Sequence, residues 1–325
     1  MQLAIRRDQS GKSTGNEFLD DVLYGLGCKQ KILYSKYFYD DAGSRLFDEI
    51  CELQEYYPYR TELAMLPGIC RDIAEVIQND IDLIEFGAGS LIKVRPVLEN
   101  LETIRRYVPV DIAGNHLLEA SNRLRETYRE KDFDIMPVEA DFSMVLDLPG
   151  LEPVIAGCVR LGFFPGSTIG NFSPEQACKL LADMRRTLGT ASWLLVGVDT
   201  KKSPELLKLA YNDAAGVTAR FNKNLLVRIN NELNGNFNLE KFDHYAFYNS
   251  ESGRVEMHLV SAAGQEVEID GNIFCFRQGE SIHTENSYKY SPREFTGLAK
   301  EAGWQTRRVW QDKDELFSHH LLYAA

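Results

Sequence analysis

The stretch IDLIEFGAGS, residues 81–90, constrains the fold more than any other part of the chain. An apolar run that ends in an acidic residue, Glu85, and then in the turn Gly87-Ala-Gly89 is typical of a buried strand. The glycines of such a turn let the backbone approach a nucleotide-like ligand at the start of a helix. The stretch therefore predicts the first strand of a ligand-binding α/β sheet, although glycine-rich turns also follow ordinary strands.

The residues after this turn indicate which cofactor it suits. A dinucleotide-binding turn carries a third glycine three residues after Gly89, where this chain has Ile92. A phosphate-binding loop of the Walker type needs a glycine before its lysine and a hydroxyl residue after it, and Lys93 has neither. Both NAD and ATP are therefore disfavoured.

Acidic residues at the ends of further predicted strands favour S-adenosylmethionine. The apolar run 107–111 ends in Asp111, and the run 135–142 ends in Asp141 and Phe142. Because the carboxyl ends of parallel strands meet at one edge of a sheet, these side chains should gather around one ligand. We expect Asp111 to accept both ribose hydroxyls, Asp141 to accept the adenine amino group, and Phe142 to cover the adenine ring.

Strands and helices alternate from residue 81 to about residue 198, which predicts a mostly parallel, Rossmann-like sheet with helices on both faces. The fourth strand, 159–165, runs into a Gly/Ser/Asn-rich loop that contains Asn171. Open α/β sheets bind ligands at this edge, so Asn171 is a candidate for substrate binding, although asparagine is equally typical of turns. Ser173 should cap the next helix, and 192–199 should form the fifth strand.

The residues before this sheet predict helices and a tyrosine-rich segment. Helical spacing of apolar residues predicts a helix over 16–27, and a second helix should begin near Asp41. The segment 31–59 is dense in tyrosine, which favours half-buried core positions whose hydroxyls are able to line a polar pocket. We predict a turn at Pro58 and a helix over 61–78 that leads into the first strand.

The composition and periodicity of the sequence change after Asp199, and the new pattern predicts a second lobe. Two stretches within 211–238 are rich in asparagine and broken by glycine, and period-two alternation then predicts antiparallel strands. These strands are expected at 242–249, 254–262, 266–269 and 281–290. A helix over 291–302 and a terminal antiparallel pair, 306–311 and 317–325, should return to the main sheet.

Charge, apolar runs, cysteines and histidines exclude several classes of protein. The chain has 36 Lys and Arg against 48 Asp and Glu, a formal charge of −12 that argues against nucleic acid as a partner. No signal-like or membrane-length apolar run is present, so we expect a cytoplasmic protein without a membrane partner. Six well-separated cysteines predict reduced, buried thiols, and the histidines do not form a typical metal-ligand pattern.

Several motifs together make the chain resemble a known family over nearly its whole length. The motifs are Tyr37-Phe-Tyr-Asp40, Glu55-Tyr-Tyr-Pro58, the Gly87 turn with Lys93, the loop that ends in Asn171-Phe172, and the segments 211–224 and 283–289. They resemble the histidine-specific, S-adenosylmethionine-dependent Nα-methyltransferases of ergothioneine biosynthesis. In that family three methyl groups pass to the α-amino group of L-histidine and give the betaine hercynine. The resemblance implies a Rossmann-like class I methyltransferase sheet with an inserted α+β substrate-binding lobe.

The resemblance also implies roles for individual residues. The residues expected around the cofactor are Gly87, Lys93, Asp111, Asp141 and Phe142, with Lys93 near the carboxylate of the cofactor. Those expected around the carboxylate and amine of histidine are Tyr56, Asn171 and Tyr211, with Tyr39 close to the amine. The imidazole is expected at Glu285 and Ser287, with Asn286 between them and Met257 on the pocket wall. One departure is visible, because Leu91 and Val94 stand where the family often has small polar residues near the lysine.

Methyl transfer from a sulfonium depends mainly on aligning the nucleophile, so we expect the hydroxyl of Tyr39 to orient the amine and assign no general base. Two alternatives keep part of this pattern. An enzyme for a related acceptor such as tryptophan would keep everything except the end of the pocket formed by Glu285, Ser287 and Met257. A non-catalytic S-adenosylmethionine-binding protein would keep only the cofactor turn. Glu285 argues against both alternatives.

We predict a methyltransferase domain formed by 60–200 and 288–325 and a substrate-binding lobe formed by 1–59 and 201–287. The expected partner is the small-molecule substrate, and a monomer is favoured.

Overall fold

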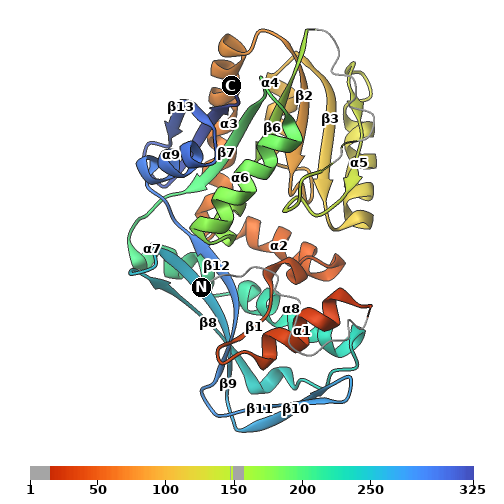
Figure 1. The fold of residues 1–325 in the computed structure, drawn as a ribbon, viewed down its shortest axis with the longest axis vertical. Coiled ribbons are helices and arrows are strands. Elements are labelled where there is room, and N and C mark those ends of the chain that lie inside the picture. The colour runs from red at the N-terminus through yellow and green to blue at the C-terminus, as the bar shows by residue number, and fades with distance from the viewer. Residues whose placement is uncertain (1–14, 147, 149–156) are drawn as a thin grey trace.

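Two β-sheets lie at opposite ends of the long axis of the structure (Figure 1). The computed structural model describes residues 15–146, 148 and 157–325. An eight-stranded sheet occupies the upper part of the view and a four-stranded sheet the lower part, where a separate two-stranded hairpin also lies.

The larger sheet confirms the predicted α/β class. Its strands are ordered β13-β14-β7-β6-β2-β3-β4, with β5 also paired to β3, and all but the pairs made by β13 and β14 are parallel. Because β3 and β6 flank β2 on opposite sides, the end of β2 is a topological switch point, where open α/β sheets bind ligands. The strands are β2 (Asp80–Phe86), β3 (Ile104–Asp111), β4 (Asp134–Ile135), β5 (Val138–Glu139), β6 (Cys158–Phe164), β7 (Trp193–Asp199), β13 (Gln305–Gln311) and β14 (Phe317–Tyr323).

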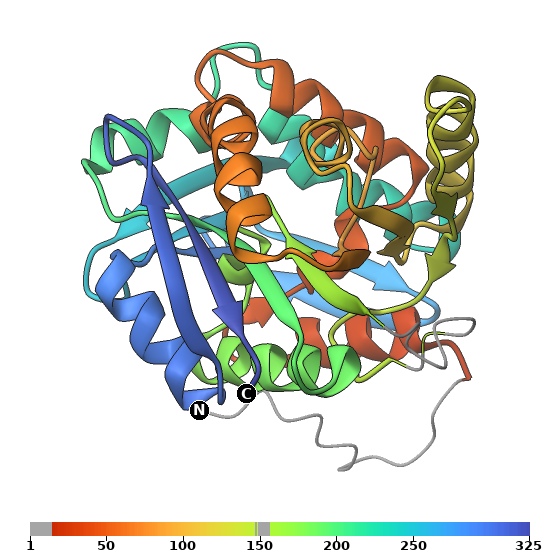
Figure 2. The ribbon, with the colours of Figure 1, turned by 90° about the horizontal axis from the view of Figure 1, so that it is seen from above.

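Helices cover both faces of this sheet, as Figure 2 shows. One apolar core joins the sheet to α6 (Pro174–Leu188) and α9 (Pro292–Glu301), whose first turns are closed by capping boxes at Ser173 and Ser291. The other core joins it to α3 (Tyr57–Val76), α4 (Arg95–Asn100) and α5 (Gly114–Thr127).

The predicted turn at Pro58 was wrong. Helix α3 begins at Tyr57, four residues before the start predicted at 61, and Pro58 lies in its first turn. Proline has no N–H to donate, but the first helical turn has no acceptor for one, so proline is tolerated there. The third strand, expected within 135–142 and ahead of Asp141, forms as the two short strands β4 and β5.

The smaller sheet has the strand order β1-β12-β9-β8 and belongs to a lobe that also contains α1, α2, α7 and α8. The turn between β10 and β11 places Asp270 and Gly271 at positive φ, as a two-residue hairpin turn requires. The elements of the lobe are α1 (Glu17–Gly27), β1 (Lys31–Ile32), η1 (Ser35–Phe38), α2 (Asp41–Glu52), α7 (Pro204–Tyr211), α8 (Val217–Glu232), η3 (Leu239–Lys241), β8 (Phe242–Asn249), β9 (Arg254–Ser261), β10 (Gln265–Ile269), β11 (Asn272–Phe276) and β12 (Ser281–Tyr288).

Helix α8 was not predicted, because asparagine and glycine weakened the helical signal. Gly216 precedes the helix in a left-handed conformation, and two of its asparagines are buried and hydrogen-bonded. Asn222 donates to the carbonyl of His258 at 3.1 Å, and Asn224 donates to Asp40 at 2.7 Å. Tertiary contacts therefore override the local propensity. Strand β11 was also missed.

The apolar core of the lobe draws its buried residues from 18–57 and 207–282, whereas the two cores of the larger sheet draw theirs from 66–198 and 288–324. The predicted domain limits stay a prediction. None of the helices in the described part of the chain combines the length and apolar character that a membrane span requires. The expectation of buried thiols was only partly correct, since Cys70 and Cys158 are buried but Cys275 is exposed.

Candidate active site

The turn after β2 has the geometry that close approach of a ligand requires. Gly87 and Gly89 have φ angles of 71° and 53°, a region that favours glycine. A Cβ at Gly87 would lie 3.2 Å from the ring of Phe142, so this aromatic side chain lies directly against the turn. The predicted positions of Gly87 and Phe142 are therefore brought together.

Asp111, at the end of β3, accepts two backbone hydrogen bonds, one of them from the same turn. Its carboxylate accepts the N–H of Gly89 and the N–H of Ala113, each at 2.9 Å. Each carboxylate oxygen retains further acceptor capacity, so Asp111 fits the two hydroxyls of a ribose. Asp141 is exposed and accepts the N–H of Ser143 at 2.8 Å. Together these residues fit the nucleoside part of S-adenosylmethionine.

Lys93 is paired with Glu62, a buried carboxylate that was not predicted as a site residue. Its Nζ lies 3.0 Å from Glu62, and a Cβ at Gly166 would lie 2.5 Å from it. Glu62 also accepts the N–H of Gly166 at 2.9 Å. Burial opposes ionisation of Glu62, but Lys93, His319 and the Gly166 N–H outweigh it and lower the pKa to about 2. Glu62 of α3 therefore joins the segment after the β2 turn, through Lys93, to the loop after β6, through Gly166.

Helical spacing offered a signal for Glu62. It lies four residues before Leu66 and shares a buried helix face with Leu66, Ile69 and Ile73. A charged residue on such a face needs a partner, because an unpaired buried charge is costly.

Glu85, which precedes the turn, is also buried. Burial raises its pKa to about 8, against the lowering effects of a hydrogen bond from Tyr107 and of the charge on Lys93. The end of β2 therefore carries a carboxyl group that is largely neutral near pH 7.

Three of the predicted tyrosines converge from different elements. The rings of Tyr56 and Tyr211 lie 6.3 Å apart, and Phe47 lies 6.2 Å from Tyr56 and 5.8 Å from Tyr39. Burial, followed by the charges of Glu285 and Asp111, raises the pKa of Tyr39 well above its ordinary value. Tyr39 therefore lies within electrostatic reach of both the cofactor turn and the predicted imidazole site, and its hydroxyl stays protonated.

Tyr56 has a similar environment. Burial, followed by the neighbouring Tyr211, raises its pKa well above its ordinary value. Protein surrounds Tyr39, Tyr56 and Glu285, yet each keeps partial contact with solvent, as expected for side chains that line a cavity.

Glu285 and Met257 are directly opposite each other on the antiparallel strands β12 and β9. Residues that face each other in this way project their side chains to the same side of the sheet, and Ser287, two positions along, joins them. Tyr211 donates a hydrogen bond to Ser287 at 2.8 Å, which identifies this side as the one toward the tyrosines. Burial raises the pKa of Glu285 to about 7, against the lowering effect of Lys289.

The prediction for Asn286 needs a correction. Asn286 is paired with Glu256, so strand alternation places its side chain on the face opposite to that of Glu285 and Ser287. Asn286 is adjacent to two pocket residues in the sequence, but its side chain projects away from them and lies outside the proposed pocket.

Asn171 is the last residue of η2 (Thr168–Asn171), which packs against β7 and β12. A Cβ at Gly170 would lie 2.7 Å from the carbonyl oxygen of Tyr288, so the loop contacts the end of β12 closely. Asn171 is thus placed where the two sheets meet and remains partly exposed.

A cluster of possible metal ligands lies on the other face of the lobe sheet and was not predicted. Atoms of Glu256, His258 and His283 lie within 4.8 Å of one another. However, the rings of His258 and His283 are stacked at 4.6 Å with an interplanar angle of 15°. A metal ion lies close to the plane of each imidazole that binds it, so two stacked rings do not direct lone pairs at one ion. The carboxylate of Glu256 is also paired with the guanidinium of Arg254, at 2.7 Å.

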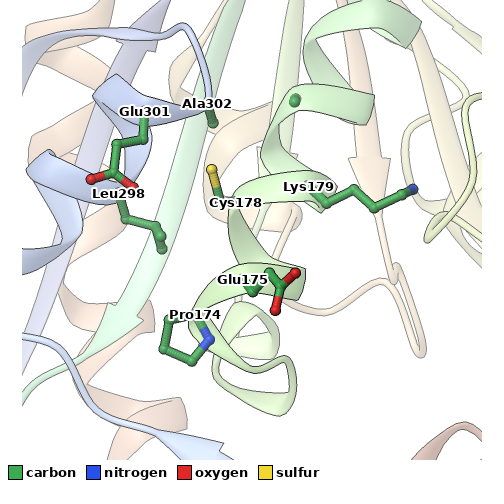
Figure 3. A pocket seen from close by; sticks show the side chains of 8 residues that line it. Pro174, Glu175, Cys178, Lys179, Leu298, Glu301 and Ala302 are labelled. Atoms are coloured by element: carbon green, nitrogen blue, oxygen red, sulfur yellow. The ribbon is translucent and has the colours of Figure 1, made fainter. Parts of the chain in front are cut away.

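A surface hollow of about 510 Å³ lies between α6 and α9 (Figure 3). The side chains that line it come from the outer helical layer, including Glu175, Cys178, Lys179, Leu298 and Glu301. None of them comes from the carboxyl end of a strand, so this hollow is separate from the candidate site.

Comparison with known proteins agrees with this geometry. A family model described as "Histidine-specific methyltransferase, SAM-dependent" matches residues 18–324. The histidine N-alpha-methyltransferase of Mycolicibacterium smegmatis is 36% identical over 96% of each chain. An ergothioneine biosynthesis protein of Schizosaccharomyces pombe is 28% identical over 81% of this chain and 35% of its own length. An L-tryptophan methyltransferase of Psilocybe serbica is 27% identical over 87% of this chain and 86% of its own. The chain therefore belongs to the histidine-specific, S-adenosylmethionine-dependent methyltransferase family.

Proposed function

We propose that this protein transfers three methyl groups from S-adenosylmethionine to the α-amino group of L-histidine. The product is hercynine, Nα,Nα,Nα-trimethylhistidine, and the reaction is the first step of ergothioneine biosynthesis. Family membership supports the reaction class, and the relative from Schizosaccharomyces pombe supports the pathway.

The observation that carries the choice of histidine is the placement of Glu285. It lies on the same face as Ser287 and opposite Met257, on the side toward Tyr211. A carboxylate and a hydroxyl on one strand face supply an acceptor for one ring nitrogen and a donor for the other. Tryptophan has a single ring N–H and no acceptor nitrogen, so it would leave one of these groups unpaired.

The chain's residues act mainly by alignment. S-adenosylmethionine supplies the methyl group as an electrophile with a neutral leaving group. We propose that Asn171 and Tyr56 hold the carboxylate of histidine beside the ring of Tyr211, while Tyr39 orients the lone pair of its amine. Because the pKa values of Tyr39 and Tyr56 are raised well above their ordinary value, both hydroxyls stay protonated and act through neutral hydrogen bonds rather than as bases.

A competition assay tests this function directly. The purified protein is incubated with S-adenosylmethionine and an equimolar mixture of the twenty amino acids, and the products are followed by mass spectrometry. We expect histidine to gain one, two and then three methyl groups while the other amino acids stay unmodified. Methylation of tryptophan in preference to histidine would support the alternative acceptor, and no methylation at all would support a non-catalytic binding protein.

Asp111→Ala is expected to weaken the binding of S-adenosylmethionine by about 1–3 kcal/mol, because the ribose hydroxyls lose a charged acceptor. Isothermal titration calorimetry measures the change, and NAD should not bind either protein. Asp134→Ala serves as the control, since Asp134 is an exposed residue in β4 of the same sheet. Equal affinities in the Asp111 variant and the control would remove Asp111 from the cofactor site.

The rate of methyl transfer at saturating histidine is expected to rise from neutral pH toward the pKa of the substrate amine, because only the free base attacks. Single-turnover kinetics isolates the chemical step. Tyr39 and Tyr56 do not titrate in this range, since their pKa values lie well above the ordinary value. A flat profile with chemistry rate-limiting would show that the enzyme removes the amine proton itself.

We further propose that the protein works in the cytoplasm as a monomer. The six cysteines are all free, which suits a reducing compartment, where disulfides are rare.

A further inference from the structure

Lys289 is a buried cation at the edge of the proposed imidazole site. It follows β12 directly and continues the alternation that places Glu285 and Ser287 on one face. Its side chain is 1% exposed, and its Nζ lies 2.6 Å from Asp199 at the end of β7. Burial lowers the pKa of Lys289, but Asp199 more than compensates and holds it above its ordinary value. Lys289 therefore stays charged.

The same ammonium donates to both hydroxyls at this end of the pocket. Its Nζ lies 2.8 Å from Ser287 Oγ and 3.1 Å from Tyr211 Oη. With the contact to Asp199, the three N–H groups of Lys289 have three acceptors. Tyr211 in turn donates its own proton to Ser287 at 2.8 Å.

These contacts determine what Ser287 has left to offer a ligand. A serine hydroxyl has two lone pairs and one proton. Lys289 and Tyr211 together occupy both lone pairs, so Ser287 retains only its donor proton.

The ring of histidine exists in two protonation states near neutral pH. The neutral imidazole has one N–H donor and one acceptor nitrogen, whereas the imidazolium has two donors. A carboxylate at Glu285 and a donor-only hydroxyl at Ser287 match the neutral ring. The imidazolium would direct its second N–H at a serine with no lone pair free and would add a charge near Lys289.

We propose that Lys289 is a positioning residue that makes Ser287 a hydrogen-bond donor and thereby selects the neutral imidazole of the substrate. The proposal rests on the proposed function and adds to it the protonation state in which the side chain is bound. Lys289 acts through Ser287 and Tyr211.

Other charged and titratable groups surround Lys289 and must be separated from this effect. Lys202 binds the same carboxylate, Asp199, from the other side, and Tyr57 donates to Asp199 at 2.8 Å. Glu285 carries the other nearby carboxyl group, and its pKa of about 7 makes the binding of any histidine analogue depend on pH. The test therefore compares two ligands that share every group except the basicity of the ring.

The two ligands are L-histidine and 3-(1,2,4-triazol-3-yl)-L-alanine, whose triazole ring stays uncharged between pH 5.5 and 7.5. Dissociation constants are measured by calorimetry with S-adenosylhomocysteine present, so that no methyl transfer occurs. Contributions of Glu285 and of the amine cancel in the ratio of the two affinities. With an ordinary imidazole pKa of about 6.5, the affinity of histidine relative to the triazole should fall about tenfold from pH 7.5 to pH 5.5.

Lys289→Met should abolish this fall, because Ser287 regains a lone pair that accepts from the imidazolium. Lys202→Met is the matched control, since it removes a cation from the same Asp199 carboxylate without touching Ser287, and it should keep the fall. Tyr211→Phe frees the other lone pair of Ser287 and should reduce the fall even where Lys289→Met does not fold.

A ratio that is independent of pH in the unmodified enzyme would overturn the proposal. So would a fall that Lys289→Met and Lys202→Met change equally, because Lys289 would then act only through its charge on Asp199. These outcomes differ from failure of the proposed function, in which histidine neither binds at any pH nor gains methyl groups in the competition assay.

Discussion

The combined substitution of Glu285 by Ala and Met257 by Val is expected to lower the selectivity for histidine over tryptophan by about a thousandfold or more. The wild-type pocket should reject tryptophan because one of its two buried polar groups would remain unpaired. Glu285 and Met257 are directly paired across β12 and β9. Removing the carboxylate of one and shortening the side chain of the other therefore makes the same part of the pocket larger and less polar. The ratio of kcat/KM values for the two amino acids measures the change.

Asn286→Ala is the matched control for this experiment. Asn286 neighbours Glu285 in the sequence but projects from the opposite face of β12, so its loss should leave the selectivity unchanged. The single variants Glu285→Ala and Met257→Val show whether the charge or the volume of the pocket contributes more to the selectivity. If selectivity survives the double substitution, the imidazole is held elsewhere and the proposed pocket is misplaced.

Replacement of Glu62 by Ala is expected to destabilise the protein by about 3–5 kcal/mol, because it leaves Lys93 without its buried counter-ion. The variant also removes the acceptor for the N–H of Gly166. The free energy of unfolding from urea titrations measures the effect. Glu49→Ala provides the comparison, since the exposed pair of Glu49 with Arg220 should contribute less than about 1 kcal/mol.

The pH dependence of this difference has a definite sign. The pKa of Glu62 is lowered from 4.5 to about 2 in the folded protein, so its stabilising contribution is complete above the unfolded value of 4.5. It is lost as the pH falls from 4.5 toward 2. The unfolding free energies of the wild type and of Glu62→Ala should therefore converge in acid. A constant difference over this range would show that the side chain acts through packing and not through its charge.

The cofactor half of the site was predictable because its signals are local. Gly87 and Gly89 follow β2 and Asp111 ends β3, both strands with a strong apolar pattern, and parallel strands bring their carboxyl ends to one edge. The resemblance to the methyltransferase family added the residues of the lobe, whose roles do not follow from periodicity.

Partners distant in the sequence were not predictable in the same way. Glu62 meets Lys93 only because α3 packs beside the end of β2, and Lys289 meets Asp199 only because β12 ends next to β7. No local sequence pattern predicts an ion pair whose members are 31 or 90 residues apart.

The sequence by itself determined the alternation of strands and helices in the larger sheet, the cofactor turn and the alternation that groups Glu285 with Ser287. These features depend on residues a few positions apart, whose spacing matches the period of a strand or helix. Only the tertiary structure decided that this face of β12 points toward Tyr211, that Asn286 points away, and that Lys289 takes up the lone pairs of Ser287. The reason is physical: a strand has two faces that its own periodicity does not distinguish, and what covers each face is chosen by packing between distant segments.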